Sequence, residues 1–91
     1  MNKQNHNYFS INSSIELQFK NSHYRNIAYN SFLPEFGKVK TERSKVSISK
    51  EENSILFEIK STDITAYRAS VNEIITFGKI VDNCLLLIEN F

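Results

Sequence analysis

The sequence predicts one α+β domain with the element order β-α-β-β-α, because three short segments alternate between apolar and polar residues and two longer ones repeat apolar residues at helical spacing. A strand–helix–strand unit makes the first two strands parallel, and a short turn brings the third strand back beside the second. The third strand then fits between the other two. We therefore expect a three-stranded antiparallel sheet in the order 1-3-2, with two helices on one face.

The 91 residues allow one small domain. Residues 1–13 are mostly polar, so we expect them to form a flexible arm, and residues 14–91 to form the domain. The first strand is expected over residues 14–20, where Ile15, Leu17 and Phe19 point to one face. A helix follows over residues 22–33, because N-cap residue types precede a helical apolar pattern and Pro34 ends it.

Two further strands are expected after a charged connector. Residues 43–50 alternate with Val46 and Ile48 inward, and residues 55–60 alternate with three apolar residues inward. The polar turn 51–54 between them predicts a hairpin. The outer face of the sheet then carries polar side chains and faces water: Glu16, Gln18, Lys45, Ser47, Glu58 and Lys60.

A long second helix is expected from Ser61–Asp63 to the last residue, because hydroxyl and acidic residues begin it and no proline interrupts it. Its core-facing stripe is expected to contain Ile64, Tyr67, Val71, Ile74, Ile75, Val81, Leu85 and Ile88. Gly78 lies on this stripe, where it would either admit a neighbouring backbone or weaken the helix by about 1 kcal/mol.

A second apolar stripe runs along another side of the same helix and consists of Phe77, Ile80, Cys84, Leu87 and Phe91. A helix that is apolar nearly all round must be buried nearly all round. About 27 residues span roughly 40 Å, whereas a domain of this size has a diameter of about 30 Å. We therefore favour burial of the second stripe by a partner over its folding back onto Tyr8 and Phe9 in the arm.

The chemistry of an enzyme is not visible in this sequence. Two glycines cannot form a phosphate-binding loop, and His6 and His23 have no further ligand at metal-binding spacing, so we expect no cofactor and no metal. His23 is expected to face water. Cys84 has no basic neighbour on its turn, which indicates a buried, inert thiol. The longest apolar run is far shorter than a membrane span, and the polar start and single cysteine predict a soluble, cytoplasmic protein.

Basic residues cluster locally although the net charge is only +1. That total excludes a strongly basic, histone-like protein. Lys38, Lys40, Arg43 and Lys45 alternate along an extended segment and would either contact phosphates or form a solvated sheet edge. Arg68 lies near the packed face of the second helix, where a pair with Glu35 or Asp63 is favoured over contact with a partner or RNA.

Several short motifs occur together in one order: Leu33-Pro34-Glu35, Arg43-Ser44-Lys45-Val46, Asp63, Arg68-Ala69 and Asn72. With these motifs on a β-α-β-β-α chain, the sequence resembles the small Pcc-type subunit of the KEOPS (EKC) complex, a family that includes the CTAG/LAGE proteins. The resemblance covers residues 14–88.

The resemblance implies a non-enzymatic subunit without a cofactor of its own. Members of the family form dimers and dock a catalytic subunit with a sugar-kinase fold, in a complex that attaches threonylcarbamoyl to an adenosine next to the tRNA anticodon. The second stripe then becomes the docking face. The Arg43-Ser44-Lys45 segment and Arg68 become candidates for structural or tRNA contacts.

Two alternatives belong to other classes. A free-standing RNA-binding module shares this element order, but the sequence has no GXXG loop and no aromatic residues on the expected outer sheet face. A dimerisation appendage of another enzyme is the third and weakest hypothesis. Co-purification with an ATP-binding protein or with RNA alone separates the first two.

Overall fold

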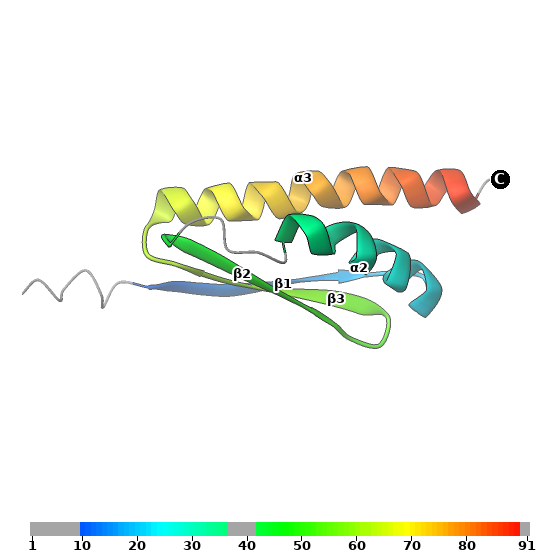
Figure 1. Cartoon of the computed structure of the whole chain (residues 1–91), viewed down its shortest axis with the longest axis horizontal. Coiled ribbons are helices and arrows are strands. Elements are labelled where there is room, and N and C mark those ends of the chain that lie inside the picture. Colours follow the sequence, from blue (N-terminus) through cyan, green and yellow to red (C-terminus); the bar gives the residue numbers. More distant parts are fainter. Residues whose placement is uncertain (1–9, 37–41, 90–91) are drawn as a thin grey trace, which may run out of the picture.

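The computed structural model describes residues 10–36 and 42–89, and it has the expected order of elements (Figure 1). The elements are β1 (Ile11–Gln18), α2 (Ser22–Phe36), β2 (Ser44–Lys50), β3 (Ser54–Ser61) and α3 (Ile64–Glu89). Both helices lie on the same face of the sheet, and the C-terminal end of α3 extends beyond the sheet. The predicted architecture is therefore confirmed.

The three strands form one antiparallel sheet in the order β1-β3-β2. Ile15 and Ile48 both pair with Phe57, so the inward side chains of the two edge strands meet across the middle of the central strand. The opposite face is mostly polar and exposed, as predicted, but it also carries half-buried Leu56 beside Glu16. β3 is the most buried strand because it has a neighbour on each side and helices above it.

β1 differs at both ends from the strand expected over residues 14–20. It begins at Ile11, so the last three residues assigned to the polar arm belong to the sheet, and it ends at Gln18. Ile11 pairs with Ser61 and is half-buried, which explains the earlier start. Phe19 lies beyond the strand, where its backbone N–H donates to the carbonyl of Asn53 at 2.8 Å.

Side-chain caps fix the start of each helix. Asn21 Oδ1 accepts from the N–H of Tyr24 at 2.9 Å, and Asp63 Oδ1 accepts from the N–H of Ala66 at 2.7 Å. Each cap satisfies one of the four N–H groups that the first turn leaves without a helical partner. Both helix starts therefore follow from the local sequence, at the positions expected for such residues.

The end of α2 corrects the expectation that Pro34 stops the helix. The helix continues through Pro34 to Phe36. Phe36 is only 3% exposed, and its ring lies 5.6 Å from that of Phe57 between centroids. Burial of an aromatic side chain contributes about 1.5–3 kcal/mol, which offsets the hydrogen bond that proline cannot make in the last turn.

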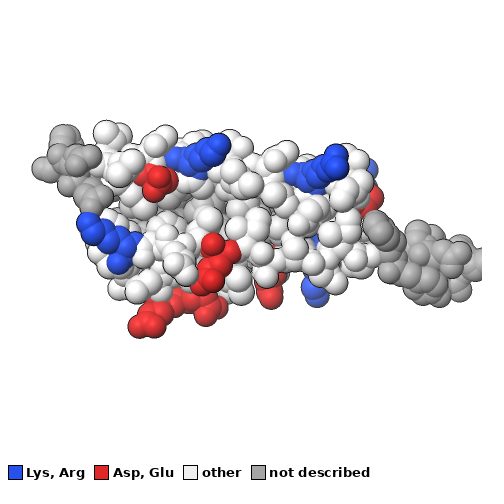
Figure 2. Space-filling view, turned by 180° about the vertical axis from the view of Figure 1, so that it is seen from behind, with Lys and Arg blue, Asp and Glu red and all other residues white. Residues whose placement is uncertain are grey.

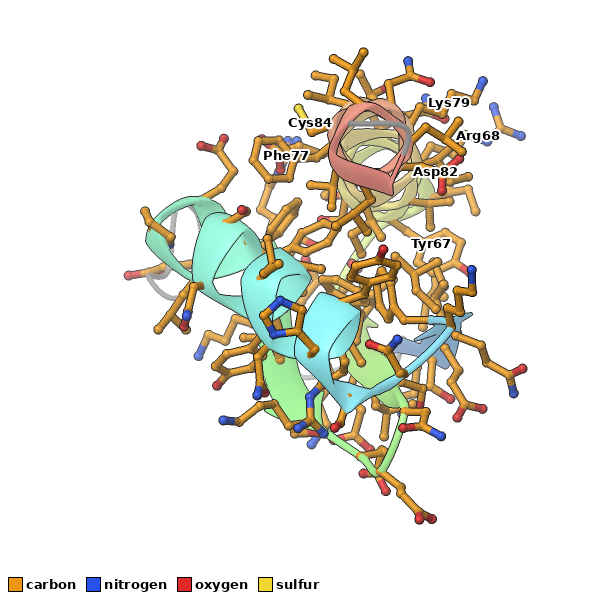
Figure 3. All side chains as sticks on the ribbon, turned by 90° about the vertical axis from the view of Figure 1, so that its right-hand side faces the viewer. Tyr67, Arg68, Phe77, Lys79, Asp82 and Cys84 are labelled. Atoms are coloured by element: carbon orange, nitrogen blue, oxygen red, sulfur yellow. The ribbon has the colours of Figure 1, made fainter. Side chains whose placement is uncertain are left out.

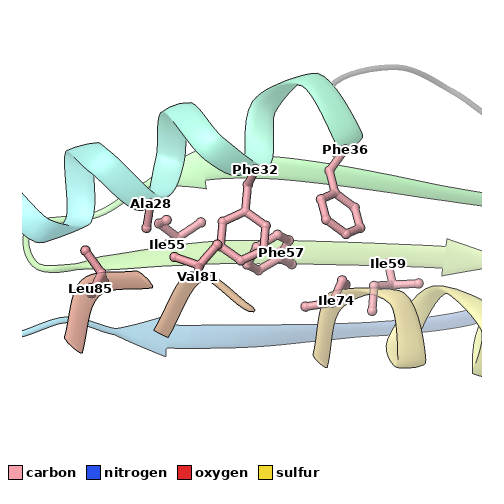
Figure 4. Close-up of a cluster of buried hydrophobic side chains, with 9 residues drawn as sticks. All are labelled: Ala28, Phe32, Phe36, Ile55, Phe57, Ile59, Ile74, Val81 and Leu85. Atoms are coloured by element: carbon pink, nitrogen blue, oxygen red, sulfur yellow. The ribbon is translucent and has the colours of Figure 1, made fainter. Parts of the chain in front are cut away.

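The core lies between the two helices and the central strand (Figure 4). Phe32 is fully buried and makes an edge-to-face contact with Phe57, with ring centroids 4.9 Å apart. Nine buried residues make up the cluster: Ala28, Phe32, Phe36, Ile55, Phe57, Ile59, Ile74, Val81 and Leu85. These residues come from α2, β3 and α3, so the core packs both helices against the central strand of the sheet.

The core-facing stripe of α3 also needs correction. Ile74, Val81 and Leu85 are buried as expected, but Ile64 and Ile75 are 49% and 46% exposed. Successive helix residues are about 100° apart, so Ile75 turns away when Ile74 points to the core. The inward positions near the start of the helix belong instead to Ala66 and Ser70, which are small and buried.

Candidate functional site

The second stripe lies on the side of α3 that faces α2, and it divides into two parts. Phe77 is half-buried, with its ring centroid 5.1 Å from that of Phe32 and 6.0 Å from that of Phe36. Ile80 and Leu87 are 52% and 71% exposed. Phe77 therefore anchors the stripe in the core, whereas the residues beyond it present apolar surface to solvent. Phe91 lies outside the described residues.

Cys84 is exposed, which corrects the expectation of a buried thiol. It projects from α3 on the same side as Phe77 (Figure 3). An apolar neighbourhood in the sequence does not produce burial here, because α2 does not cover this turn of α3. The structure thus leaves Ile80, Cys84 and Leu87 together on one uncovered surface.

A further apolar surface, which the sequence analysis assigned to the core or left out, lies on the opposite side of α3. Ile64, Ile75 and Leu86 are each about half exposed, at 49%, 46% and 48%. Figure 3 places Arg68, Lys79 and Asp82 on this side of the helix, away from Phe77 and Cys84. The three apolar and three charged residues recur at helical spacing, which is a signal for this side of the helix. It was missed because Ile64 and Ile75 were assigned to one broad core-facing stripe.

Lys38, Lys40, Arg43 and Lys45 form what we call the basic segment. Its first described residue, Arg43, forms an ion pair. Arg43 Nε lies 3.4 Å from Asp63 Oδ2. Arg43 is also held through its backbone carbonyl, which accepts from the N–H of Thr62 at 2.8 Å. Both contacts tie the start of β2 to the start of α3, while 61% of the Arg43 side chain remains exposed.

Lys45 has a basic neighbour that the sequence analysis did not assign to the site. It pairs directly with Lys60 across the β2–β3 register, and both side chains are exposed on the outer face. Like charges directly opposite each other are mildly destabilising unless solvent or an anion screens them. Cross-strand register is the signal that finds Lys60. Lys38 and Lys40 lie outside the described residues.

Arg68 does not join this basic group. It is exposed on the helix layer, and within residues 10–36 and 42–89 it forms no ion pair, so pairing with Asp63 or Glu35 is not found. Figure 2 shows basic side chains set apart along the helix layer, while most acidic side chains lie along the lower edge. Arg68 lies on α3 and Lys45 on β2, so the two exposed side chains belong to different surfaces.

Three buried serines lie directly beneath the basic segment. The Ser44 hydroxyl is 2.7 Å from that of Ser61 and 2.6 Å from that of Ser70. Ser44, Ser61 and Ser70 come from β2, β3 and α3, and each is at most 9% exposed. The network holds the first turns of α3 on the sheet, so Ser44 within Arg43-Ser44-Lys45 is structural.

Three features used by other classes of protein are not found in the described part of the chain. Residues 10–36 and 42–89 contain no group of three potential metal ligands. Neither of the two helices resolved there is long and apolar enough to cross a membrane. The described strands carry no aromatic side chain on the outer sheet face, which a base-stacking RNA surface would use.

Comparison with known proteins yields a family and a fold. The family model described as transcription factor Pcc1 matches residues 12–85. A chain in a crystal structure of a binary Gon7–Pcc1 complex superimposes with a TM-score of 0.75 at 22% identity. That match covers 86% of this chain and 95% of the other, and at this identity it shows a common fold. No curated protein matches the sequence.

Proposed function

Because the chain belongs to the Pcc1 family of small KEOPS subunits, we propose that it is a non-catalytic dimerisation and docking subunit of that complex. In this role it joins catalytic subunits with a sugar-kinase fold and contributes to tRNA binding, in the cytoplasm. The complex modifies tRNA with threonylcarbamoyl, and the reacting groups belong to the other subunits. The family match over most of the chain carries this proposal.

Uncovered apolar surface on α3 supports a docking role. Ile80 and Leu87 each leave about half or more of their surface in water, although burying such a side chain contributes about 1.5–3 kcal/mol. A partner helix that covers the second stripe would recover this free energy. The matched chain of known structure, which has the same fold, belongs to a binary Gon7–Pcc1 complex.

The basic residues support the tRNA-binding part of the proposal. Lys45 and Lys60 lie side by side on the outer face, next to the Arg43–Asp63 pair. Phosphate groups would relieve the repulsion between the two lysines. Lys38 and Lys40 precede them in the sequence, and together these residues form the segment we propose to contact tRNA, with Arg68 as the remaining candidate from the sequence.

The test of docking is Leu87→Asp, measured by binding to the purified sugar-kinase-fold subunit. We expect at least about a tenfold loss of affinity, because an interface would bury an unpaired carboxylate. Circular dichroism should show an unchanged fold, since Leu87 is 71% exposed.

Asn72→Asp is the matched control because it adds the same charge at an exposed position of α3, about four turns before Leu87 and outside the second stripe. It should bind the catalytic subunit normally. Equal binding by both variants would remove the second stripe from the docking face. A Leu87→Asp chain that unfolds would show that this residue belongs to the core.

A further inference from the structure

A row of three polar side chains crosses the outer face of the sheet, at the end where β3 leads into α3. Asn12, Lys60 and Lys45 are direct neighbours in the register of β1, β3 and β2, and all three are exposed. Two ammonium groups and one side-chain amide can each donate hydrogen bonds to an anion. We call these three residues the lysine row, and their chemistry suits a phosphate group.

The outer face becomes acidic beyond the lysine row. Glu58 lies two residues from Lys60 on the same face of β3, and Glu16 lies four residues from Asn12 on β1. Both side chains are exposed. Their carboxylates repel a phosphate group, so the outer face attracts an anion most strongly at the lysine row.

Arg43 precedes Lys45 on the chain but does not extend the lysine row. Its Nε lies 3.4 Å from Asp63 Oδ2, and Asp63 lies in the connection from β3 to α3, which packs on the other face of the sheet. Within residues 10–36 and 42–89, in contrast, neither Lys45 nor Lys60 forms an ion pair. A carboxylate therefore balances the charge of Arg43, but not those of the two lysines.

Backbone contacts hold both members of the Arg43–Asp63 pair in place. Asp63 Oδ1 accepts from the N–H of Ala66 at 2.7 Å, so the carboxylate is already ordered as the cap of α3. The Arg43 carbonyl accepts from the N–H of Thr62 at 2.8 Å. An exposed ion pair is usually weak because two side chains must be ordered to form it. The cap removes part of that cost here, which favours a persistent pair.

We propose that Asp63 is a positioning residue, which holds the Arg43 guanidinium away from phosphate groups and leaves the phosphate contacts of the outer face to the lysine row. The proposal rests on the tRNA-binding part of the proposed function and specifies which charges act. A phosphate that approaches Arg43 also approaches the Asp63 carboxylate, whose like charge repels it. An arginine that is already neutralised adds little to counterion release.

Asp63→Asn separates the ion pair from the helix cap, because asparagine caps a helix about as well as aspartate but carries no charge. The full-length variant is assembled with its partner subunits, and tRNA is titrated at several salt concentrations. Once Arg43 is released, the log–log salt slope should steepen by about one, and binding should tighten about threefold to tenfold at about 0.1 M salt. Arg43→Ala alone should leave the slope unchanged, whereas Lys60→Ala should reduce it by about one.

The double variant, Asp63→Asn with Arg43→Ala, shows whether the gain comes from the arginine. It should lose the gain and return to within about twofold of the natural affinity, because the two residues act as one unit. Glu16→Gln is the matched control, since it removes the same charge from the outer face on the opposite edge strand. It should leave the slope unchanged. Circular dichroism checks the fold of each variant.

The outcomes separate this proposal from the proposed function. A steeper slope for Asp63→Asn that Arg43→Ala abolishes supports the proposal. A weaker affinity for Asp63→Asn, a gain that persists in the double variant, or a slope reduced by Arg43→Ala alone would overturn it and leave the tRNA contact in place. Unchanged slopes in every variant, Lys60→Ala included, would overturn it together with tRNA binding by the outer face, while docking would still be judged by Leu87→Asp.

Discussion

Buried hydroxyl groups are the residue-scale feature that most constrains this domain. Ser44 sits between Ser61 and Ser70, at 2.7 and 2.6 Å, where an apolar side chain would otherwise be expected. A buried hydroxyl that loses its partner keeps the cost of its desolvation. The three hydroxyls therefore act as a unit that joins β2, β3 and α3.

Ser44→Ala should lower the free energy of unfolding by about 1–3 kcal/mol, because it leaves the hydroxyls of Ser61 and Ser70 without their shared partner. Ser47→Ala, on the exposed face of the same strand, should change stability by no more than about 0.5 kcal/mol. Urea denaturation measures both. Equal effects would mean that the network contributes no net stability.

Gly78→Ala should stabilise the domain by up to about 1 kcal/mol. An added Cβ would lie 3.5 Å from Leu17 Cδ1, which is ordinary van der Waals contact, and no backbone approaches closely. Of the two roles expected for this glycine, only the helix-weakening one therefore fits. Thermal unfolding checks this, and a lower melting temperature for the variant would show that the space above β1 is filled.

At this scale the sequence predicted the residues that act locally. Asn21 and Asp63 cap helices because capping depends on the neighbouring three residues. The partners of Arg43 and Ser44 were not predicted, because they come from elements about 20 residues away in the sequence. Cys84 was misjudged because burial depends on which part of α3 its neighbour α2 covers.

At the scale of elements, contacts at the two ends of β2 hold the outer face of the sheet in place. Arg25 of α2 donates from Nη1 to the backbone carbonyls of Glu51 and Glu52, the latter at 3.0 Å, and so holds the β2–β3 hairpin against the helix. The opposite end of β2 is held by the Arg43–Asp63 pair. The outer face between them is consequently a stable platform, with Lys45 and Lys60 near its basic end.

Replacing Lys38, Lys40, Arg43 and Lys45 by alanine should weaken tRNA binding by the assembled complex without preventing assembly. Each lost phosphate contact should reduce the log–log salt slope by about one. Arg43 is the exception in part, because its pair with Asp63 also supports the fold. We expect the slope to fall by about three, measured by tRNA titration at several salt concentrations.

Lys50→Ala is the control for this variant, since Lys50 is at the far end of β2, where its ammonium lies 5.1 Å from the centre of the Tyr29 ring. It should leave the salt slope unchanged. An intact complex in which the fourfold variant also keeps the natural slope would identify the basic segment as a solvated sheet edge, and the tRNA surface would then lie on other subunits.

The elements themselves were largely predictable, and their ends less so. Alternation located all three strands because each has one wet face. The end of α2 was missed because the penalty of Pro34 is local, whereas the compensating burial of Phe36 comes from the sheet and α3. Only one of the two uncovered sides of α3 was predicted. The apolar pattern of a helix does not show how much of its circumference the rest of the fold will cover.

The whole molecule has helices on one face of its sheet only, so half of α3 has no layer above it. That architecture leaves the second stripe on one side of α3 and exposed Ile64, Ile75 and Leu86 on the other, with the basic segment on the sheet beneath. Two partners can therefore bind α3 without competing for the same side chains. This separation supports the proposed role of a subunit that joins copies of itself to a catalytic protein.

The most direct test of the proposed role is purification of the tagged, full-length chain from its own cells, followed by mass spectrometry and RNA analysis. We predict a stoichiometric partner with a sugar-kinase fold and ATP-binding activity, and its loss in the Leu87→Asp variant but not in Asn72→Asp. Recovery of RNA alone, with no such protein at any salt concentration, would contradict the account and favour a free-standing RNA-binding module.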